Sequence, residues 1–284
     1  RALEISAAGK HNVLMIGPPG SGKTMLAMRL PTIMSPMTIE ESLETTMIYS
    51  SSGLLQDDRP ILTRPFRTPH HTASEIAIVG GGTNPKPGEI SLAHNGVLFL
   101  DEFPEFKRPV IEALRQPLEE GKITVSRASL SIQFPADFLL VSAMNPCPCG
   151  HYGDESKPCT CSYSQILKYR KKLSGPILDR IDIHIEVPRV PVSEFRKNTT
   201  EESSEKIRDR VIRAREIQAK RFKKNNFFNS KMTPSMIKKY CQLDSTSQDL
   251  LEKAVEKFKY SARTYNKILK LARTIADLDN SEKI

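Results

Sequence analysis

A glycine-rich segment near the start of the chain has residue types and a spacing that suit phosphate binding. Residues 17–24 read Gly-Pro-Pro-Gly-Ser-Gly-Lys-Thr and match G-x-x-x-x-G-K-[ST], with an apolar stretch before them and a helix-compatible stretch after them. Backbone N–H groups of such a loop converge on phosphate oxygens. We expect Lys23 to reach the β- and γ-phosphates of ATP and the Thr24 hydroxyl to bind Mg²⁺. The predicted nucleotide-binding set is Gly17, Pro18, Pro19, Gly20, Ser21, Gly22, Lys23 and Thr24.

Two acidic residues end a second apolar stretch. Asp101 and Glu102 follow the run Val-Leu-Phe-Leu at residues 97–100. Asp101 suits the magnesium shell, and Glu102 suits polarisation of an attacking water. Many strands end in an acid, so this pattern gains its meaning only from the phosphate-binding loop upstream.

Three more side chains are candidates for the same chemistry. Asn145 ends a third apolar stretch, where a neutral amide could orient water, although a turn-forming role before Pro146 explains it equally well. Arg180 and Arg263 could neutralise the charge that develops during phosphoryl transfer. Arg273 competes with Arg263 for this role, and spacing alone does not choose among 42 basic residues.

Four of the five cysteines lie close together in the sequence, as Cys147, Cys149, Cys159 and Cys161. Four thiolates can satisfy tetrahedral Zn²⁺ and would staple a Gly/Pro-rich loop over residues 147–161, with His151 able to replace one of them. The spacing is not a common zinc-finger pattern, so reduced loop thiols and redox chemistry remain alternatives. Cys241 is distant and reads as a buried apolar side chain. His70 and His71 lack a third ligand at a recognisable spacing and are expected to order their loop or to touch a phosphate.

The elements that must position these residues read as an open parallel sheet with crossover helices. Apolar stretches alternate with helix-like ones, and ligands bind at the carboxyl ends of strands in such sheets. A period-two stretch predicts a β-hairpin at about 122–134, and a segment rich in Pro, Gly and His predicts an inserted loop at about 60–91. The predicted strands are residues 12–17, 96–103, 138–145 and 183–188.

A change of texture after Pro191 divides the chain into two predicted domains. Residues 1–192 form the α/β core, and residues 193–284 show the three- and four-residue spacing of amphipathic helices. The chain has 42 basic and 33 acidic residues, a net charge of +9, and the whole excess lies in the second domain. This asymmetry is a cue for nucleic acid, and a solvated, lysine-rich helical surface explains it equally well.

Composition excludes several classes of protein. No stretch approaches the roughly 20 apolar residues of a membrane span, and 26% charged residues exclude collagen-like and wholly disordered chains. Clustered cysteines do not resemble a secreted disulfide framework, which favours a reducing cytoplasm. The sequence begins at Arg1 within a helix-like stretch, so we expect an upstream part.

The order of these motifs resembles the ComM/YifB-type, magnesium-chelatase-like AAA+ ATPases. The resemblance covers nearly the whole chain and includes GPPGSGKT, the insert RPFRTPHHTASEIAIVGGGTNPKPGEISLAHNGVLFLDEF, SAMNPCPCG, LSGPILDRIDIHIEVP and SARTYNKILKLARTIADL. It implies an AAA+ core with a helix-2 insert at about 66–91 and a hairpin before sensor 1, followed by a small helical lid. Members of the family also carry a Lon-protease-like domain ahead of the ATPase.

The resemblance implies a role for each candidate. Lys23 and Thr24 correspond to Walker A, and Asp101 and Glu102 to Walker B. Asn145 corresponds to sensor 1, Arg180 to an arginine finger acting on a neighbouring subunit, and Arg263 to sensor 2. A finger acting in trans implies a homo-oligomeric ring, expected to be a hexamer. The insert and hairpin would line its pore, which makes Lys122 and Arg127 candidate contacts for single-stranded or branched DNA.

The expected function is an ATPase that moves DNA, with ATP and Mg²⁺ as cofactors, no membrane partner and a cytoplasmic location. By resemblance its role is branch migration of DNA taken up in natural transformation. The main alternative is the ATPase subunit of magnesium chelatase, because that enzyme shares the same core. A regulatory ATPase that remodels a protein partner is the third reading.

Overall fold

The computed structural model describes residues 1–55, 59–127, 130–154, 157–189 and 202–284, which divide into two compact units. One unit comprises Asn12–Pro31 and Pro36–Thr200 and contains the central sheet. The other comprises Arg1–His11, Thr32–Ser35 and Glu201–Ile284 and is helical. No helix among the described residues is long and apolar enough to cross a membrane.

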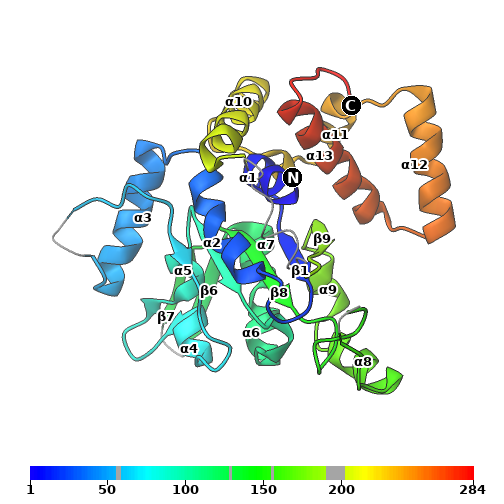
Figure 1. Ribbon diagram of the computed structural model, residues 1–284. Coiled ribbons are helices and arrows are strands. Elements are labelled where there is room, and N and C mark those ends of the chain that lie inside the picture. Colours follow the sequence, from blue (N-terminus) through cyan, green and yellow to red (C-terminus); the bar gives the residue numbers. More distant parts are fainter. Residues whose placement is uncertain (56–58, 128–129, 155–156, 190–201) are drawn as a thin grey trace. The chain divides into compact units, whose positions relative to one another are not determined.

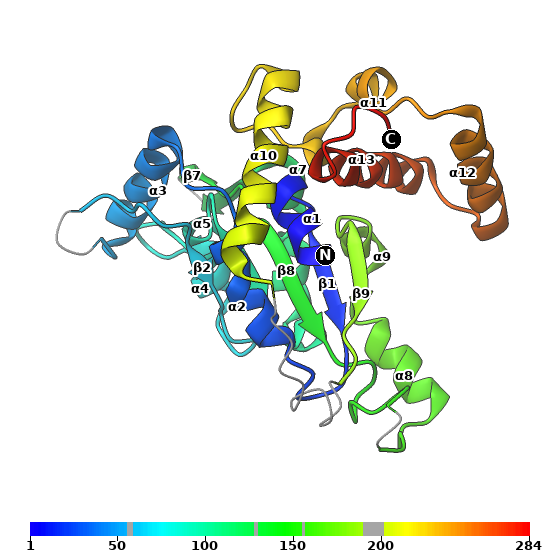
Figure 2. The same ribbon diagram turned by 45° about the horizontal axis from the view of Figure 1, so that its top comes forward.

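The sheet unit is built on a five-stranded parallel sheet in the order β2-β5-β8-β1-β9. The strands are β2 (Phe66–Arg67), β5 (Val97–Leu100), β8 (Leu139–Met144), β1 (Val13–Ile16) and β9 (Ile183–Glu186). Every residue of β5 and β8 is buried, because helices cover both faces of such a sheet and its central strands are apolar on both sides. Figure 2 shows β8 and β1 side by side, with their arrowheads at the same end. The predicted fold class is confirmed.

Short helices pack around this sheet (Figure 1). Their apolar faces join the strand residues in one core cluster that includes Phe103, Ile111, Leu114 and Ile177. The helices are α2 (Lys23–Ile33), α3 (Ile39–Ser52), α5 (Glu89–Leu92), α6 (Arg108–Ala113), α7 (Arg115–Glu120), α8 (Tyr163–Arg170) and α9 (Gly175–Leu178), with a 3₁₀ turn at Phe103–Glu105.

The segment that we expected to be an inserted loop is more structured than that. It contains β2, α4 (Glu75–Val79), β3 (Gly80–Gly81) and β4 (Lys86–Pro87), and β2 extends the central sheet by pairing with β5. The backbone N–H of Val97 also donates to the carbonyl of Pro65 at 2.8 Å. A strand of two residues carries no readable periodicity, which is why the sequence pattern missed it.

The predicted hairpin is present as β6 (Lys122–Arg127) and β7 (Leu130–Pro135). The two strands pair antiparallel from Lys122 opposite Pro135 to Arg127 opposite Leu130. Ile123 and Val125 are buried while Lys122 and Thr124 are partly exposed, as period-two alternation requires.

The helical unit contains α1 (Ala2–Gly9), α10 (Ser204–Phe222), α11 (Pro234–Tyr240), α12 (Ser245–Phe258) and α13 (Ala262–Leu278), with a 3₁₀ turn at Asn229–Lys231 (Figure 1). Ser203 and Ser261 cap α10 and α13 by accepting backbone N–H groups of the first turn. Gln218 of α10 donates to the carbonyl of Ala8 at 3.1 Å, and His11 Nε2 lies 2.8 Å from Thr274 Oγ1.

These contacts group α1 with the C-terminal helices, whereas the sequence-based division placed residues 1–11 in the core. Residues 190–201, where the predicted boundary at 192–193 lies, are outside the described residues. The division of the chain into a nucleotide-binding core of residues 1–192 and a lid of residues 193–284 stays a prediction.

Candidate functional site

The phosphate-binding loop joins the end of β1 to the start of α2. β1 ends at Ile16 and α2 begins at Lys23. Gly20 and Gly22 have φ values of +77° and +85°, which glycine adopts without strain. The Gly17 position is crowded, because a Cβ there would lie 2.2 Å from the carbonyl oxygen of Val187. Gly20 and Gly22 therefore allow the loop to turn, and Gly17 allows it to approach the segment after β9 closely.

Lys23 is buried and folds back along its own loop. Its Nζ donates to the carbonyl oxygens of Gly17 at 2.7 Å and Pro18 at 2.9 Å, and to Asn145 Oδ1 at 3.4 Å. Burial lowers the pKa of Lys23, and the nearby charge of Asp101 acts in the opposite direction. The ammonium group thus lies inside the loop, where phosphate oxygens could replace the backbone carbonyls.

Thr24 and Asp101 meet at the tip of β5. The Thr24 hydroxyl donates to Asp101 Oδ2 at 2.8 Å, and the backbone N–H of Glu102 donates to Asp101 Oδ1 at 2.9 Å. A hydroxyl and a carboxylate are the hard oxygen ligands that Mg²⁺ prefers. The buried hydroxyl of Ser21 has no hydrogen-bond partner among the described residues, as expected of a loop built to receive a polar ligand. The residues present therefore fit Mg²⁺ and a nucleotide phosphate.

Glu102 has a left-handed backbone, with φ at +50°, and a side chain that is 53% exposed. Its carboxylate oxygen Oε2 lies 3.1 Å from His71 Nδ1. The His71 ring lies against His70 with ring centroids 4.2 Å apart and the planes tilted by 32°, and it meets Phe106 edge-on. Sequence reasoning expected His71 to order its loop or to touch a phosphate, and it did not predict this contact with Glu102, because the spacing of His71 from the acidic pair carries no motif.

Asn145 directly follows β8, which lies between β5 and β1 in the sheet. The backbone N–H of Gly17 donates to the carbonyl of Met144 at 3.2 Å, which ties the end of β8 to the start of the loop. Because β1, β5 and β8 are parallel neighbours, their carboxyl ends bring together Lys23, Thr24, Asp101, Glu102 and Asn145.

Arg180 lies away from this group. It follows α9, its side chain is 8% exposed, and its guanidinium donates to the Pro176 carbonyl and to Glu119 of α7. Its Nε is buried without a partner among the described residues. In the single chain Arg180 is therefore held against α7, and a role at a neighbouring subunit stays a prediction.

The structure separates the two rival arginines of α13. Arg273 is buried, pairs with Asp277 and donates to the carbonyls of Ser281 and Glu282, so it has a structural role within the helical unit. Arg263 lies in the first turn of the same helix and is exposed. Accessibility to a ligand therefore favours Arg263 over Arg273 as the sensor 2 candidate.

The hairpin candidates differ in what the structure describes. Lys122 begins β6, and its Nζ donates to Gln133 Oε1 of β7 at 3.4 Å. The backbone of Arg127 belongs to β6, and its side chain lies outside the described part of the structure. Contacts of either residue with DNA stay predictions.

The four clustered cysteines bring their sulfur atoms together. One ligand atom from each of Cys147, Cys149, Cys159 and Cys161 lies within 4.8 Å of all the others, and none of them forms a disulfide. Hydrogen bonds from the backbone N–H groups of His151 and Thr160 lower the pKa of Cys149 to about 5. Cys241 is buried in the helical unit, as expected, and burial raises the pKa of its thiol to about 11.

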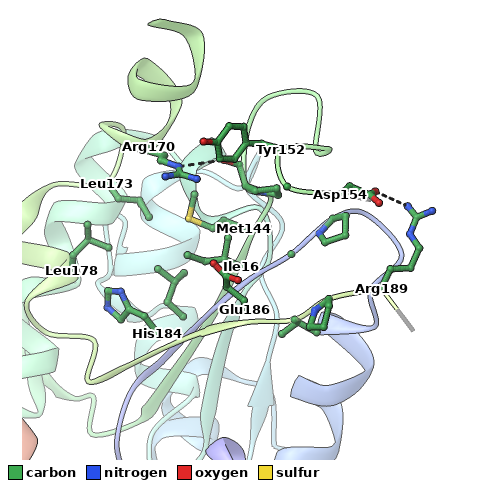
Figure 3. A pocket seen from close by; sticks show the side chains of 17 residues that line it. Ile16, Met144, Tyr152, Asp154, Arg170, Leu173, Leu178, His184, Glu186 and Arg189 are labelled. Atoms are coloured by element: carbon green, nitrogen blue, oxygen red, sulfur yellow. Dashed lines mark hydrogen bonds and ion pairs between the residues drawn. The ribbon is translucent and has the colours of Figure 1, made fainter. Parts of the chain in front are cut away.

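A cavity of about 1030 Å³ lies beside the phosphate-binding loop (Figure 3). Gly17 and Pro18 form one part of its wall, and Tyr152 and Asp154, which lie between Cys149 and Cys159, form another. Residues of β9, including His184 and Glu186, complete the lining.

Two family models match the chain. The model described as "Magnesium chelatase, subunit ChlI" matches residues 1–195, and that described as "Magnesium chelatase, subunit ChlI C-terminal" matches residues 201–284. Together they account for both of the compact units.

Curated relatives agree with these models. The chain is 52% identical over 291 residues to Competence protein ComM of Haemophilus influenzae and 47% identical over 285 residues to YifB of Escherichia coli, and each match covers 100% of this chain and 55% of the relative. The chloroplastic magnesium-chelatase subunit ChlI of Oryza sativa subsp. indica is 26% identical over 180 residues, which are 63% of this chain and 38% of the relative. This chain thus spans 55% of the length of ComM and YifB. The chain belongs to the magnesium chelatase ChlI family and, within it, to the group that includes ComM and YifB.

Proposed function

We propose that this chain hydrolyses ATP at the carboxyl edge of its parallel sheet and works as one subunit of a ring-shaped motor that moves DNA. The observation that carries the ATPase part is the contact of Thr24 with Asp101, flanked by Lys23 and Glu102. Lys23 and Thr24 begin α2 after the loop from β1, Asp101 and Glu102 follow β5, and together they hold the ammonium, hydroxyl and carboxylate groups that phosphoryl transfer requires.

The proposed roles follow from the position of each side chain. Lys23 binds the β- and γ-phosphates in place of the carbonyls that it now contacts, and Thr24 and Asp101 hold Mg²⁺, which neutralises charge on the phosphate oxygens. Glu102 accepts a proton from the attacking water, and Asn145 orients that water without adding negative charge.

Arg180 is proposed to act on the ATP of a neighbouring subunit, which requires a homo-oligomeric ring, and we propose a hexamer. In this role its guanidinium leaves Glu119 and stabilises charge on the transferred phosphoryl group. Arg263, exposed on α13, is proposed to act as sensor 2 of the lid over residues 193–284.

The proposed substrate of the motor is single-stranded or branched DNA, as in branch migration during natural transformation. Three observations support it: the net charge of +9, the concentration of that charge in the C-terminal third, and the high identity to a relative named Competence protein ComM. Lys122 and Arg127 of the β6–β7 hairpin are the proposed DNA contacts.

A second candidate is the ATPase subunit of magnesium chelatase. The observation in its favour is that both family models carry that description and that the ChlI subunit of Oryza sativa is a detectable relative. The much higher identity to ComM and YifB makes the DNA motor the first choice.

The proposed cofactors are ATP-bound Mg²⁺ and a structural Zn²⁺ at the four clustered cysteines, which has no part in hydrolysis. The proposed location is the cytoplasm. Five free cysteines support this, because a reducing compartment preserves thiols.

The test of the proposed function is ATP hydrolysis measured at moderate, fixed salt without DNA and with single-stranded, duplex and branched DNA in turn. Salt is held constant because binding to the DNA backbone weakens steeply as it rises. We expect DNA to raise turnover, most strongly with single-stranded or branched DNA. ATP turnover that is robust but the same with and without each DNA would overturn the DNA-motor proposal and favour the chelatase subunit. Absence of ATP turnover in a correctly folded chain would overturn the ATPase proposal.

A further inference from the structure

The cysteine loop, residues 147–161, brings four sulfur atoms within 4.8 Å of one another, and three of them lie at the separations of a tetrahedral metal site. Four sulfurs at the usual Zn–S distance of about 2.3 Å lie about 3.8 Å from one another. The Sγ atoms of Cys147 and Cys159 are 3.7 Å apart, those of Cys149 and Cys159 are 3.6 Å apart, and those of Cys147 and Cys149 are 3.4 Å apart. A disulfide needs about 2.05 Å, so the arrangement fits a shared cation better than a pair of S–S bonds.

Backbone N–H groups surround these sulfurs as they do metal-bound thiolates. Tyr152 donates its N–H to Cys147 Sγ at 3.3 Å, Cys149 donates to Cys161 Sγ at 3.4 Å, and Cys161 donates to Cys159 Sγ at 3.4 Å. Such bonds orient each sulfur and stabilise its negative charge. The backbone of the loop is therefore folded around the cluster.

The described residues between Gly150 and Ile166 are held by polar and ring contacts and not by apolar burial. None of these residues is buried, so the described part of this segment forms no apolar core of its own. A polar segment of this kind needs a cross-link to keep one conformation. A bound metal ion supplies one, and a set of four soft thiolate ligands selects Zn²⁺.

The cysteine loop also braces the phosphate-binding loop. Gly150 has φ +84° and lies so close to Pro19 that an added Cβ would be 2.7 Å from Pro19 Cδ. Asp154 pairs with Arg189 at 3.7 Å, and Arg189 donates to the carbonyl of Pro19 at 3.2 Å. Figure 3 shows the Asp154–Arg189 pair at the rim of the cavity.

The cavity explains why this support matters. Gly17 and Pro18 line a space of about 1030 Å³, so no packed core backs the phosphate-binding loop on that side. On the opposite wall, Arg170 covers the Tyr152 ring with its guanidinium carbon 5.3 Å from the centroid and donates to the Pro146 carbonyl at 3.3 Å (Figure 3). Beside this cavity, the contacts of the cysteine loop with Pro19 therefore add support to the bonds that Gly17 makes with Met144 and that Lys23 makes within its own loop.

We infer that Cys147, Cys149, Cys159 and Cys161 bind one structural Zn²⁺, and that this zinc-stapled loop holds the phosphate-binding loop in its binding conformation. The second half rests on the proposed nucleotide-binding role of residues 17–24. Binding of zinc then orders the cysteine loop, which holds the phosphate-binding loop and so raises the affinity for ATP. The zinc ion takes no part in ATP hydrolysis.

Metal content is the first test. We expect the purified full chain to contain about one zinc per chain, and cobalt exchanged into it to show the visible spectrum of a tetrahedral thiolate site. Cys241→Ala, which removes the cysteine outside the cluster, should leave the zinc content unchanged, whereas the double variant Cys149→Ser/Cys159→Ser should lose it. A wild-type chain that takes up neither zinc nor cobalt under reducing conditions would overturn the metal site.

Amide hydrogen exchange tests the bracing without relying on ATP. Removal of zinc from the folded chain with a chelator should make residues 17–24 exchange about tenfold faster, and refilling with zinc should restore their protection. Helix α3 of the same unit is the internal reference and should not change. Unchanged exchange of the phosphate-binding loop in the zinc-free chain would overturn the bracing, whatever the outcome for hydrolysis.

A matched pair of glycine variants tests the bracing while all four cysteines stay in place. Gly150→Ala places a Cβ against Pro19, whereas Gly153, with φ +79°, has no atom within 4 Å of its added Cβ. Both substitutions carry the same left-handed strain, so the contact with Pro19 is what distinguishes them. We expect Gly150→Ala to raise the Kd for ATP about tenfold through loss of a preorganised loop, with zinc retained, and Gly153→Ala to stay within about twofold. Equal effects of the two variants would overturn the bracing.

Discussion

His71 Nδ1 lies 3.1 Å from Oε2 of Glu102, so a side chain of the insert touches the carboxylate proposed to activate water. The histidine follows β2, the edge strand that pairs with β5, and β5 ends just before Asp101 and Glu102. The His70 ring, tilted by 32° against that of His71, and the Phe106 ring, which meets it edge-on, contact the His71 ring on its other sides. The insert is therefore in direct contact with the proposed catalytic group.

Replacing His71 by Ala is expected to lower kcat for ATP hydrolysis about ten- to a hundredfold, because Glu102 loses the group that orients it. The KM for ATP should change little, since the recorded contacts of His71 are with Glu102, His70 and Phe106. Ser74→Ala is the control, because Ser74 caps α4 of the same insert through Ala77, and steady-state kinetics is the measurement. A fall in kcat of the same size in both variants would show that the fold of the insert matters and the His71–Glu102 contact does not.

Glu102→Gln is expected to lower ATP turnover by about 10²–10⁴, the usual contribution of a general base, while ATP binding remains intact. Binding persists because the proposed phosphate ligand Lys23 and the Thr24–Asp101 contact are unaltered. Fluorescent-nucleotide titration and a phosphate-release assay on the same preparation separate the two steps. Ordinary turnover in this variant would contradict the assignment of Glu102.

Arg180→Ala is expected to reduce hydrolysis about 10³–10⁵-fold without preventing ATP binding. Mixing this variant with Lys23→Ala, which is inactive for lack of nucleotide binding, should restore part of the activity, since an intact Arg180 then faces an intact loop on another subunit. Glu119→Gln removes the partner that holds Arg180 in the single chain and should retain turnover. A mixture of the two variants that shows no ATP hydrolysis would contradict action of Arg180 on a neighbouring subunit.

Affinity for ATP is expected to fall at alkaline pH, and the fall should begin at a pH below the ordinary pKa of lysine. Burial lowers the pKa of Lys23, so its ammonium loses its proton earlier than a free lysine does, and the neutral amine no longer attracts phosphate. Above that pKa the binding constant should drop by up to about tenfold per pH unit. Calorimetric titrations between about pH 7.5 and 10 measure this, with circular dichroism to verify folding at each pH. A constant affinity across the range would show that the charge of Lys23 is not needed.

Asp277→Ala is expected to destabilise the helical unit by about 3–5 kcal/mol, the cost of leaving buried positive charge without its partner. The Asp277 side chain is fully buried and accepts from Arg221 at 2.8 Å, Asn229 at 2.8 Å and Arg273 Nε at 3.1 Å. Asp279→Ala is the control, because Asp279 is 57% exposed and pairs with Arg1 at 2.6 Å. Urea unfolding followed by circular dichroism should show a much larger loss for Asp277→Ala, and equal losses would contradict the burial argument.

The place of the phosphate-binding loop, between a strand and a helix, could be predicted from the sequence alone. Its residues are contiguous between Gly17 and Thr24, so their order along the chain already specifies the loop that they form. The central strands were equally readable, because strands buried on both faces leave unbroken apolar runs. The resemblance to a known family then supplied roles for Arg180 and Arg263 that no local pattern contains.

Tertiary structure decided what depends on contacts between distant segments. The strand order β2-β5-β8-β1-β9 brings Asn145 beside Lys23 and His71 beside Glu102, and no periodicity records such neighbours. Burial distinguished the two candidate arginines of α13, since Arg273 is buried and pairs with Asp277, whereas Arg263 is exposed. Cysteine spacing left a zinc site, reduced thiols and redox chemistry open, and only the folded chain brought the four sulfur atoms together and placed Gly150 against Pro19. Local sequence specifies what a segment can form and bind, whereas the packing of the sheet decides which segments act together.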